Sequence, residues 1–270
     1  MPGSWFDAAP AGDASDTVAG IIELATTAEV NTGTDATKAV TPAALAASAL
    51  ATDTRYQQIN FTSSGSFSKA SYSWAKSYKV TCIGGGGAGG GAPETGAGEA
   101  AMGGGGGAGG VAYDHGLVSA FGSSETVTIG AAGASTNTTN GGAGGTTSFG
   151  SKAVSGGGTG GLARAASATP HAAQPGVGGS GTAGDLQLSG GSGNVGFITD
   201  NELGFSGKGG DGPFGAGGRS RVTTGAQELS GYAATGYGAG GSGNIRNASK
   251  TGTLSSGAGS PGLVIVELYG

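Results

Sequence analysis

The chain has little cysteine, histidine, charge or aromatic side chain. Its 270 residues include one cysteine, Cys82, and two histidines, while charged residues make up 11% and aromatic residues 6%. A single cysteine rules out an intrachain disulfide and any cysteine-cluster metal site. Neither His115 nor His171 has metal-ligand spacing around it, so we expect no metal and no cofactor.

The charge and the hydrophobic pattern exclude further classes of protein. The formal net charge is −5, which gives no basic surface for nucleic acid. No apolar run approaches the length of a membrane-spanning helix, so we expect no membrane insertion. The first residues lack the basic and apolar regions of a signal peptide, and we therefore expect synthesis in a cytoplasm.

Glycine is what the chain has in excess. It accounts for 64 of the 270 residues and is concentrated in tracts such as residues 84–91 and 103–110. Glycine loses much backbone entropy on folding, so disorder is the default expectation, but segments of strong β character lie between the tracts. Because glycine lets two backbones approach closely, as in collagen, we predict extended threefold helices that pack side by side through N–H···O=C bonds.

Four segments have the composition of β-strands that end at glycines. They carry β-branched and aromatic side chains, and they are residues 77–83, 125–129, 146–154 and 263–269. The last is continuously apolar. We expect it to pair with residues 77–83 and so to close the domain end to end.

The N-terminal region contains one strand signal and two helix signals. Residues 18–24 predict a short strand, and Thr26 with Glu29 has the spacing of a capping box. Thr41 followed by Pro42 predicts a second helix start, with alanine-rich residues continuing to about residue 50. Helices this short are not stable alone in water, so we expect identical copies around a symmetry axis to pack against them.

Residues 19–45 closely resemble a module of bacteriophage tail fibres; they read AGIIELATTAEVNTGTDATKAVTPAAL. The shared positions are Gly20 and residues 29–30, 33–35 and 39–42, in order. In that family the module belongs to a trimeric fibre, so the resemblance implies a homotrimer. The second half is also similar to the glycine-rich domain of such fibres, in residues 61–67, 78–87, 127–133, 144–150 and 259–269.

We predict a fold that is mainly β and irregular, in three parts. Residues 1–20 form a tail-attachment segment, in which Trp5 and Phe6 dock on a phage tail or baseplate protein or else pack onto their own chain. Residues 21–58 form a short β/α trimeric neck with short helices. Residues 59–270 form a glycine-rich distal receptor-binding domain of β-strands and packed polyglycine II-like helices.

Large side chains between the glycine tracts are the candidate binding residues, because loops on a stiff frame commonly carry binding sites. Aromatic rings offer flat faces to sugars or proteins, and arginines offer forks to carboxylate or phosphate. Each residue could instead simply pack over the glycine scaffold. The candidates are Tyr113, His115, Phe197, Phe205, Phe214, Arg219, Arg221, Tyr232 and Tyr237.

Catalysis is not expected from this sequence. Asp114 and His115 are neighbours in a predicted extended segment, so their side chains point opposite ways and cannot act as a dyad. A polysaccharide-degrading tail spike would need two carboxylates about 5 to 10 Å apart, and no spacing brings a pair together. The carboxylates available for such a pair are Glu94, Glu99, Asp200 and Glu202.

The resemblance and the loops together imply a bacteriophage tail fibre or tail-tip adhesin. It would reside in the virion tail and bind a bacterial surface polysaccharide or outer-membrane protein during host adsorption. Three copies would multiply a weak affinity through effective concentration. A structural or ice-binding glycine-rich protein is the alternative from another class. It would spread its large side chains evenly along its faces, whereas an adhesin would gather them at one end.

Overall fold

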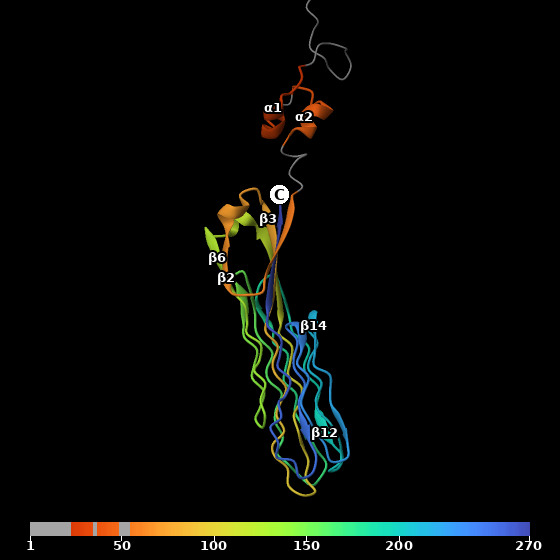
Figure 1. Cartoon of the computed structure of the whole chain (residues 1–270). Coiled ribbons are helices and arrows are strands. Elements are labelled where there is room, and N and C mark those ends of the chain that lie inside the picture. Colours follow the sequence, from red (N-terminus) through yellow and green to blue (C-terminus); the bar gives the residue numbers. More distant parts are fainter. Residues whose placement is uncertain (1–22, 35–36, 49–54) are drawn as a thin grey trace, which may run out of the picture. The chain divides into compact units, whose positions relative to one another are not determined.

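The computed structural model describes residues 23–34, 37–48 and 55–270. These residues fall into two compact units, the first ending at Tyr56 and the second comprising Gln57–Tyr269. Figure 1 labels the main elements of both units. Trp5 and Phe6 lie outside the described residues, as does most of the strand predicted at residues 18–24.

The first helix of the N-terminal unit has the predicted capping box. Helix α1 spans Thr27–Thr32 and follows Thr26, whose hydroxyl accepts a hydrogen bond from the Glu29 amide at 3.3 Å. The Glu29 carboxylate accepts one in return from the Thr26 amide at 2.9 Å. It also binds the Lys38 ammonium at 2.6 Å. Gly33 ends the helix in the left-handed conformation, with φ of 63°.

The second helix also begins as predicted but is shorter than expected. Helix α2 spans Pro42–Ala46, and its N-cap Thr41 accepts a hydrogen bond from the Ala44 amide at 3.0 Å. Neither helix buries any of its residues. The side chains of Leu24, Val40 and Leu45 are 61%, 52% and 48% exposed. A single copy of this unit therefore leaves Leu45 of α2, and Leu24 and Val40 beside the helices, open to solvent.

Two five-stranded sheets pack against each other at one end of the glycine-rich unit (Figure 1). The first has the order β1 (Tyr56–Phe61), β19 (Leu263–Tyr269), β3 (Ser77–Ile83), β5 (Val111–Leu117) and β11 (Leu186–Leu188). The second has the order β10 (Gly181–Ala183), β8 (Ala153–Ser155), β7 (Thr147–Phe149), β6 (Ser124–Thr128) and β2 (Gly65–Ser68). A short 3-10 helix at Lys69–Tyr72 follows β2, and another at Val118–Ala120 lies between β5 and β6.

The predicted pairing of the closing strand is confirmed. β19 and β3 pair antiparallel along all their residues, from Leu263 opposite Ile83 to Tyr269 opposite Ser77. Apolar side chains from both sheets fill the space between them, because alternate residues of each strand face inward. In this core the rings of Phe67, Phe121 and Phe149 meet with centroids 5.4 to 5.6 Å apart.

The prediction of a single strand at residues 146–154 is wrong. The segment forms two strands, β7 and β8, which pair antiparallel with Phe149 opposite Ala153. Gly150 makes the reversal possible because its backbone adopts φ of 51°, a conformation that residues other than glycine rarely adopt. The β-branched composition indicated the strands correctly, but the glycine between them was not recognised as a turn.

Three smaller sheets complete the unit, and Figure 1 shows β12 toward the end opposite β2, β3 and β6. A four-stranded sheet has the order β15 (Val222–Thr224), β13 (Leu203–Phe205), β12 (Gly196–Ile198) and β9 (His171–Ala173). A two-stranded sheet pairs β14 (Phe214–Ala216) with β17 (Thr235–Tyr237). A three-stranded sheet has the order β16 (Glu228–Leu229), β18 (Ile245–Arg246) and β4 (Ala101–Met102).

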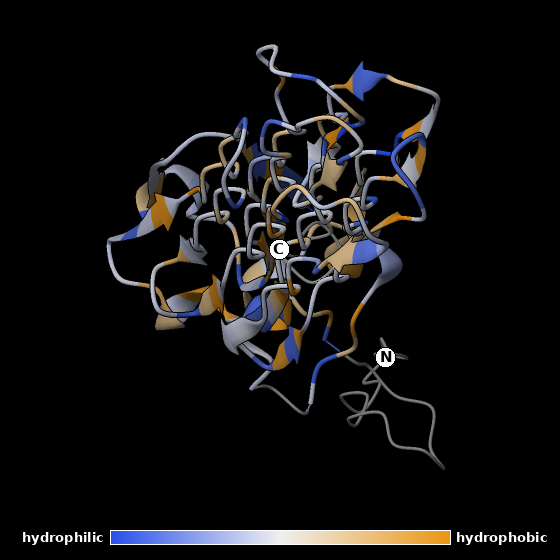
Figure 2. Ribbon diagram, turned by 90° about the horizontal axis from the view of Figure 1, so that it is seen from below, coloured by the Kyte–Doolittle hydropathy of each residue, from blue (hydrophilic) through white to orange (hydrophobic). Residues whose placement is uncertain are grey.

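Extended glycine tracts connect these sheets and occupy the middle of the unit, where Figure 2 shows pale coils with more strongly coloured short strands around them. The tract at residues 84–91 donates its N–H groups to three other tracts in turn, so that the acceptor tract repeats at every third residue. The bonds run from Gly84 to Gly110, Gly85 to Gly145, Gly86 to Ser260, Gly87 to Gly107, Ala88 to Gly142, Gly89 to Gly257 and Gly90 to Gly104.

The same tract also accepts hydrogen bonds from three further tracts, at residues 130–134, 156–162 and 239–244. It therefore has neighbours on all sides, and all of its residues are buried. The tract at residues 103–110 is surrounded in the same way. Almost every backbone donor in these two tracts is satisfied by another part of the backbone, which replaces the side-chain packing that glycine cannot provide.

The spacing between tracts leaves no room for a side chain at most glycines. A Cβ atom placed on Gly86 would lie 1.9 Å from the carbonyl oxygen of Ala239 and 2.3 Å from its carbonyl carbon. Both obstructing atoms belong to the backbone, so a rotamer change cannot relieve the clash. Gly65, on β2, has no atom within 4 Å of the same position.

We expect Gly86→Ala to destabilise the protein strongly, because two tracts must separate to accept the methyl group. The expected loss is at least about 3 kcal/mol of unfolding free energy, whereas Gly65→Ala should change it by less than about 0.5 kcal/mol. Chemical denaturation of the two variants measures both values. Equal stability of the two would contradict close backbone packing as the constraint.

Glu29 should remain ionised to low pH. The hydrogen bond from Lys38, with those from Thr26, lowers the pKa of Glu29 from 4.5 to about 2. The stabilisation from this carboxylate is thus fully present above pH 4.5 and is lost as the pH falls toward 2. An NMR titration of the Glu29 side chain should give a midpoint near 2 in the wild type and a higher one in Lys38→Gln. A midpoint near 4.5 in the wild type would contradict the cap geometry.

Candidate functional site

The candidate residues Tyr113 and His115 lie on a paired strand and not in a loop. Both are on β5, which pairs along its whole length with β3, so the expectation that the candidates lie on loops is wrong for these two residues. The alternation of side chains along β5 places them on the face turned away from the core between the two sheets. Tyr113 stands opposite Thr81 and Leu186, and His115 stands opposite Lys79.

An open groove of about 340 Å³ lies along this face. We call it the outer-sheet groove; it is lined by Lys79, Tyr113, Asp114, His115, Asp185 and Leu186. His115 Nδ1 lies 2.8 Å from Asp185 Oδ2, which also accepts the His115 amide at 2.9 Å. Nothing in the sequence near His115 indicated Asp185, because the two residues are far apart in the chain and meet only when β11 pairs with β5.

Asp114 points away from His115, as the strand geometry predicted. Its carboxylate accepts a hydrogen bond from the Tyr78 hydroxyl at 2.6 Å, toward the core side of the sheet. Burial raises the pKa of Tyr78, and the hydrogen bond to Asp114 raises it further. Cys82 is fully buried nearby, and burial raises the pKa of its thiol to about 12. Neither Tyr78 nor Cys82 is therefore an ionised nucleophile at neutral pH.

Phe197 and Phe205 come together on the four-stranded sheet. They lie directly opposite each other on β12 and β13, with Ala172 of β9 on one side and Val222 of β15 on the other. We call these four side chains the phenylalanine row. Phe197 is 44% exposed, Phe205 43% and Val222 48%. The row is thus an apolar stripe that crosses four strands and faces solvent in one copy of the chain.

The other face of this sheet fixes the row in place. Ile198 is buried there in a small core with Met102 and Ile245. A Cβ atom on Gly204 would lie 2.2 Å from Ile198 Cδ1, so glycine at this position lets β13 lie close to that core. The sequence identified the two phenylalanines separately. It did not indicate that Val222 would join them, because strand register is set by pairing between distant segments.

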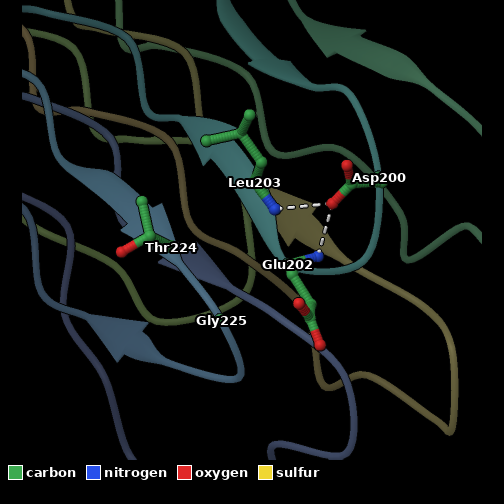
Figure 3. Close-up of a pocket in the computed structure, with 5 residues that line it drawn as sticks. All are labelled: Asp200, Glu202, Leu203, Thr224 and Gly225. Carbon is green, nitrogen blue, oxygen red and sulfur yellow. Dashed lines mark hydrogen bonds between the residues drawn. The ribbon is translucent and has the colours of Figure 1, made fainter.

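Two of the four acidic residues considered for glycoside cleavage, Asp200 and Glu202, lie at the end of the same sheet, whereas Glu99 accepts a hydrogen bond from the Gly96 amide elsewhere. Asp200, Glu202, Leu203, Thr224 and Gly225 line an open pocket of about 450 Å³ (Figure 3). Asp200 Oδ1 accepts hydrogen bonds from the amides of Glu202 at 2.8 Å and Leu203 at 2.7 Å, so this carboxylate stabilises the turn between β12 and β13. The Glu202 carboxylate points away from that of Asp200 (Figure 3).

Phe214 and Tyr237 form another cross-strand pair. They lie opposite each other on β14 and β17, and Phe214 is 50% exposed. Tyr237 packs beside Ile83 and Leu263 in a small apolar cluster. The structure thus places Tyr237 partly in the scaffold and Phe214 on the surface. Phe197, Phe205 and Phe214 are the phenylalanines with large exposed area in the described part of the chain.

The two arginines and Tyr232 form one cluster, which we call the arginine–tyrosine cluster. The guanidinium carbon of Arg219 lies 4.3 Å from the centroid of the Tyr232 ring, and that of Arg221 lies 3.9 Å from it. Arg221 also donates from Nη1 to the Tyr232 hydroxyl at 2.7 Å and from Nε to the Ser230 carbonyl at 2.6 Å. These contacts hold both cations against one aromatic ring.

Other kinds of site were sought across residues 23–34, 37–48 and 55–270. Within those ranges, no three histidine, cysteine or acidic side chains come together in a way that could hold a metal ion. None of the described helices is long and apolar enough to cross a membrane.

Comparison with known protein families gives one match. Residues 62–269 match a family described as a glycine-rich domain, which covers most of the chain and the whole bundle of tracts. No protein with a curated description matches the sequence.

Proposed function

Because the chain belongs to the glycine-rich domain family and exposes phenylalanine side chains on a backbone-bonded scaffold, we propose that the protein is a bacteriophage tail fibre or tail-tip adhesin. It binds a bacterial surface receptor during host adsorption and does not cleave it. The resemblance of residues 19–45 to a tail-fibre module supports this assignment. In this proposal the protein resides in the virion tail, and residues 1–20 attach it to a tail or baseplate protein.

The observation that carries the proposal is the phenylalanine row. Fully burying a phenylalanine side chain contributes about 1.5 to 3 kcal/mol, so two half-exposed rings beside Val222 are a favourable surface for a partner to cover. The row lies on the sheet that contains β12, toward the end of the unit opposite β3 (Figure 1). The candidate side chains do not all gather at one end, since Tyr113 and His115 lie on β5 beside β3 and the phenylalanine row lies toward the opposite end. The continuity of the row, and not the overall distribution of large side chains, is therefore what favours an adhesin over a structural or ice-binding protein.

The glycine tracts supply the stiffness that a fibre tip needs. We infer that they are polyglycine II-like helices, which have three residues per turn. Successive N–H groups of such a helix point in three directions, and the three-residue repeat of acceptors around residues 84–91 supports this inference. A stiff frame lowers the entropy cost of binding, because side chains on its surface are already in position.

We further propose that the protein is a homotrimer joined through residues 21–58. Helices α1 and α2 bury none of their residues, while Leu24, Val40 and Leu45 are about half exposed or more. Helices of six and five residues cannot persist on propensity alone. Two further copies would cover these three apolar side chains.

The trimer is tested by mass in solution. Sedimentation equilibrium should give three times the chain mass of 25.1 kDa, and Leu24→Ser/Leu45→Ser should shift the protein toward monomer because it removes apolar area from the interface. Leu188→Ser, on the glycine-rich unit, should leave the mass unchanged. A monomeric wild type would contradict the proposal.

Receptor binding is tested with fluorescently labelled protein on a panel of bacterial strains. The wild type should label at least one strain, and Phe197→Ser/Phe205→Ser should reduce that labelling at least about tenfold, as expected for residues that anchor an interface. Leu117→Ser/Leu188→Ser, also exposed on strands of this unit and outside the outer-sheet groove, is the matched control and should label normally.

Two results would overturn this part of the proposal. One is labelling of no strain by the wild type. The other is dissociation of the oligomer in Phe197→Ser/Phe205→Ser, which would make the row a contact between subunits. Sedimentation of that variant therefore accompanies the cell assay.

A further inference from the structure

The arginine–tyrosine cluster places two positive charges on one aromatic ring, with no carboxylate of the described residues paired to either. Both guanidinium carbons lie within 4.3 Å of the centre of the Tyr232 ring, so the distance between them cannot exceed the sum of the two ring distances. This bound is about equal to the screening length of about 8 Å in physiological salt, so the two charges still act together on a nearby anion. Within the described residues, neither Arg219 nor Arg221 has a carboxylate at salt-bridge distance.

The distinguishing feature of this cluster is that two guanidinium groups share one aromatic ring in an acidic chain. The formal net charge of the chain is −5, and charged residues are only 11% of the sequence. Lys38, Lys79 and Lys208 each contact a carboxylate, whereas Lys69 and Arg246 donate to backbone carbonyls. Two arginines on one ring without a paired carboxylate in the described chain give a local positive field that attracts anions.

The free edges of the two guanidinium groups point to the kind of anion. Arg221 uses Nε and one hydrogen of Nη1 for its bonds to Ser230 and Tyr232, which leaves its remaining N–H groups available. Arg219 is exposed, and its contact is with the ring face alone. Guanidinium edges of this kind bind carboxylate or phosphate through paired N–H···O bonds.

We propose that Arg219, Arg221 and Tyr232 form a binding site for the carboxylate or phosphate groups of an acidic bacterial surface polysaccharide. This inference rests on the proposed function, because it takes the ligand from the surface that the adhesin meets. A polysaccharide repeats its anionic group along the chain, so several copies of the cluster in one assembly can bind it together. Tyr232 holds the arginines in place, and the anion relieves their mutual repulsion.

Calorimetric titration with defined oligosaccharides tests the site without using cells. The carboxylate probe is oligogalacturonate, the phosphate probe is pentamannosyl 6-phosphate, and the neutral control is mannopentaose. At least one charged probe should bind, more weakly as NaCl is raised, and the neutral one should not. Which charged probe binds identifies the source of the oxyanion.

Substitutions then locate the binding. Arg219→Gln and Arg219→Gln/Arg221→Gln should lower the affinity for the charged probe, the double variant by at least about tenfold. Lys152→Gln/Arg164→Gln removes the same charge elsewhere on the unit and should keep the affinity within about twofold. Arg219 makes no hydrogen bond to the rest of the described chain, so the single variant remains informative even if the double variant is destabilised.

Failure of both charged probes to bind the wild type would overturn the inference. So would equal affinity in Arg219→Gln/Arg221→Gln, or an equal loss in Lys152→Gln/Arg164→Gln. None of these results bears on the labelling of cells through the phenylalanine row. Conversely, if the protein binds the oligosaccharide but labels no strain, the proposed anion site stands and the proposed adhesin function is contradicted.

Discussion

The close approach of one glycine backbone to another is the constraint on which the rest of the structure depends. Residues 84–91 and 103–110 each bond to neighbouring tracts on every side, and at positions such as Gly86 the neighbouring carbonyl occupies the space of a side chain. Each bond contributes modestly, but an unmade one would leave a buried polar group unsatisfied. The bundle is therefore held by a complete set of backbone hydrogen bonds and by the exclusion of larger residues.

This constraint determines where large side chains can lie. Inside the bundle nothing larger than the methyl groups of Ala88 and Ala108 is accommodated among the two central tracts. Large side chains must therefore lie where tracts give way to short strands, as Phe197 and Phe205 do, or at the edge of the bundle, as Arg219 does. Position in the fold, more than local sequence, separates scaffold from surface.

The sequence was sufficient for features that depend on neighbouring residues or on composition. The capping box of Thr26 and Glu29 and the pairing of the closing strand with residues 77–83 were predicted and are confirmed. The turn at Gly150 was missed, because one glycine among 64 carries no signal for positive φ. The contact of His115 with Asp185 and the alignment of Phe205 with Val222 were not predictable, since both arise from register between distant strands.

A scaffold held by its backbone also separates stability from recognition. In most domains a change in a large side chain disturbs the core that supports it, so binding surfaces can vary only within the limits of packing. Here the hydrogen bonds of the bundle do not involve the side chains of Phe197, Phe205 or Arg219. Substitutions at these positions alter the surface while the tracts remain bonded to one another. Such a protein can change what it binds without first acquiring a new fold, which is the property that a receptor-binding tip requires when its receptor varies.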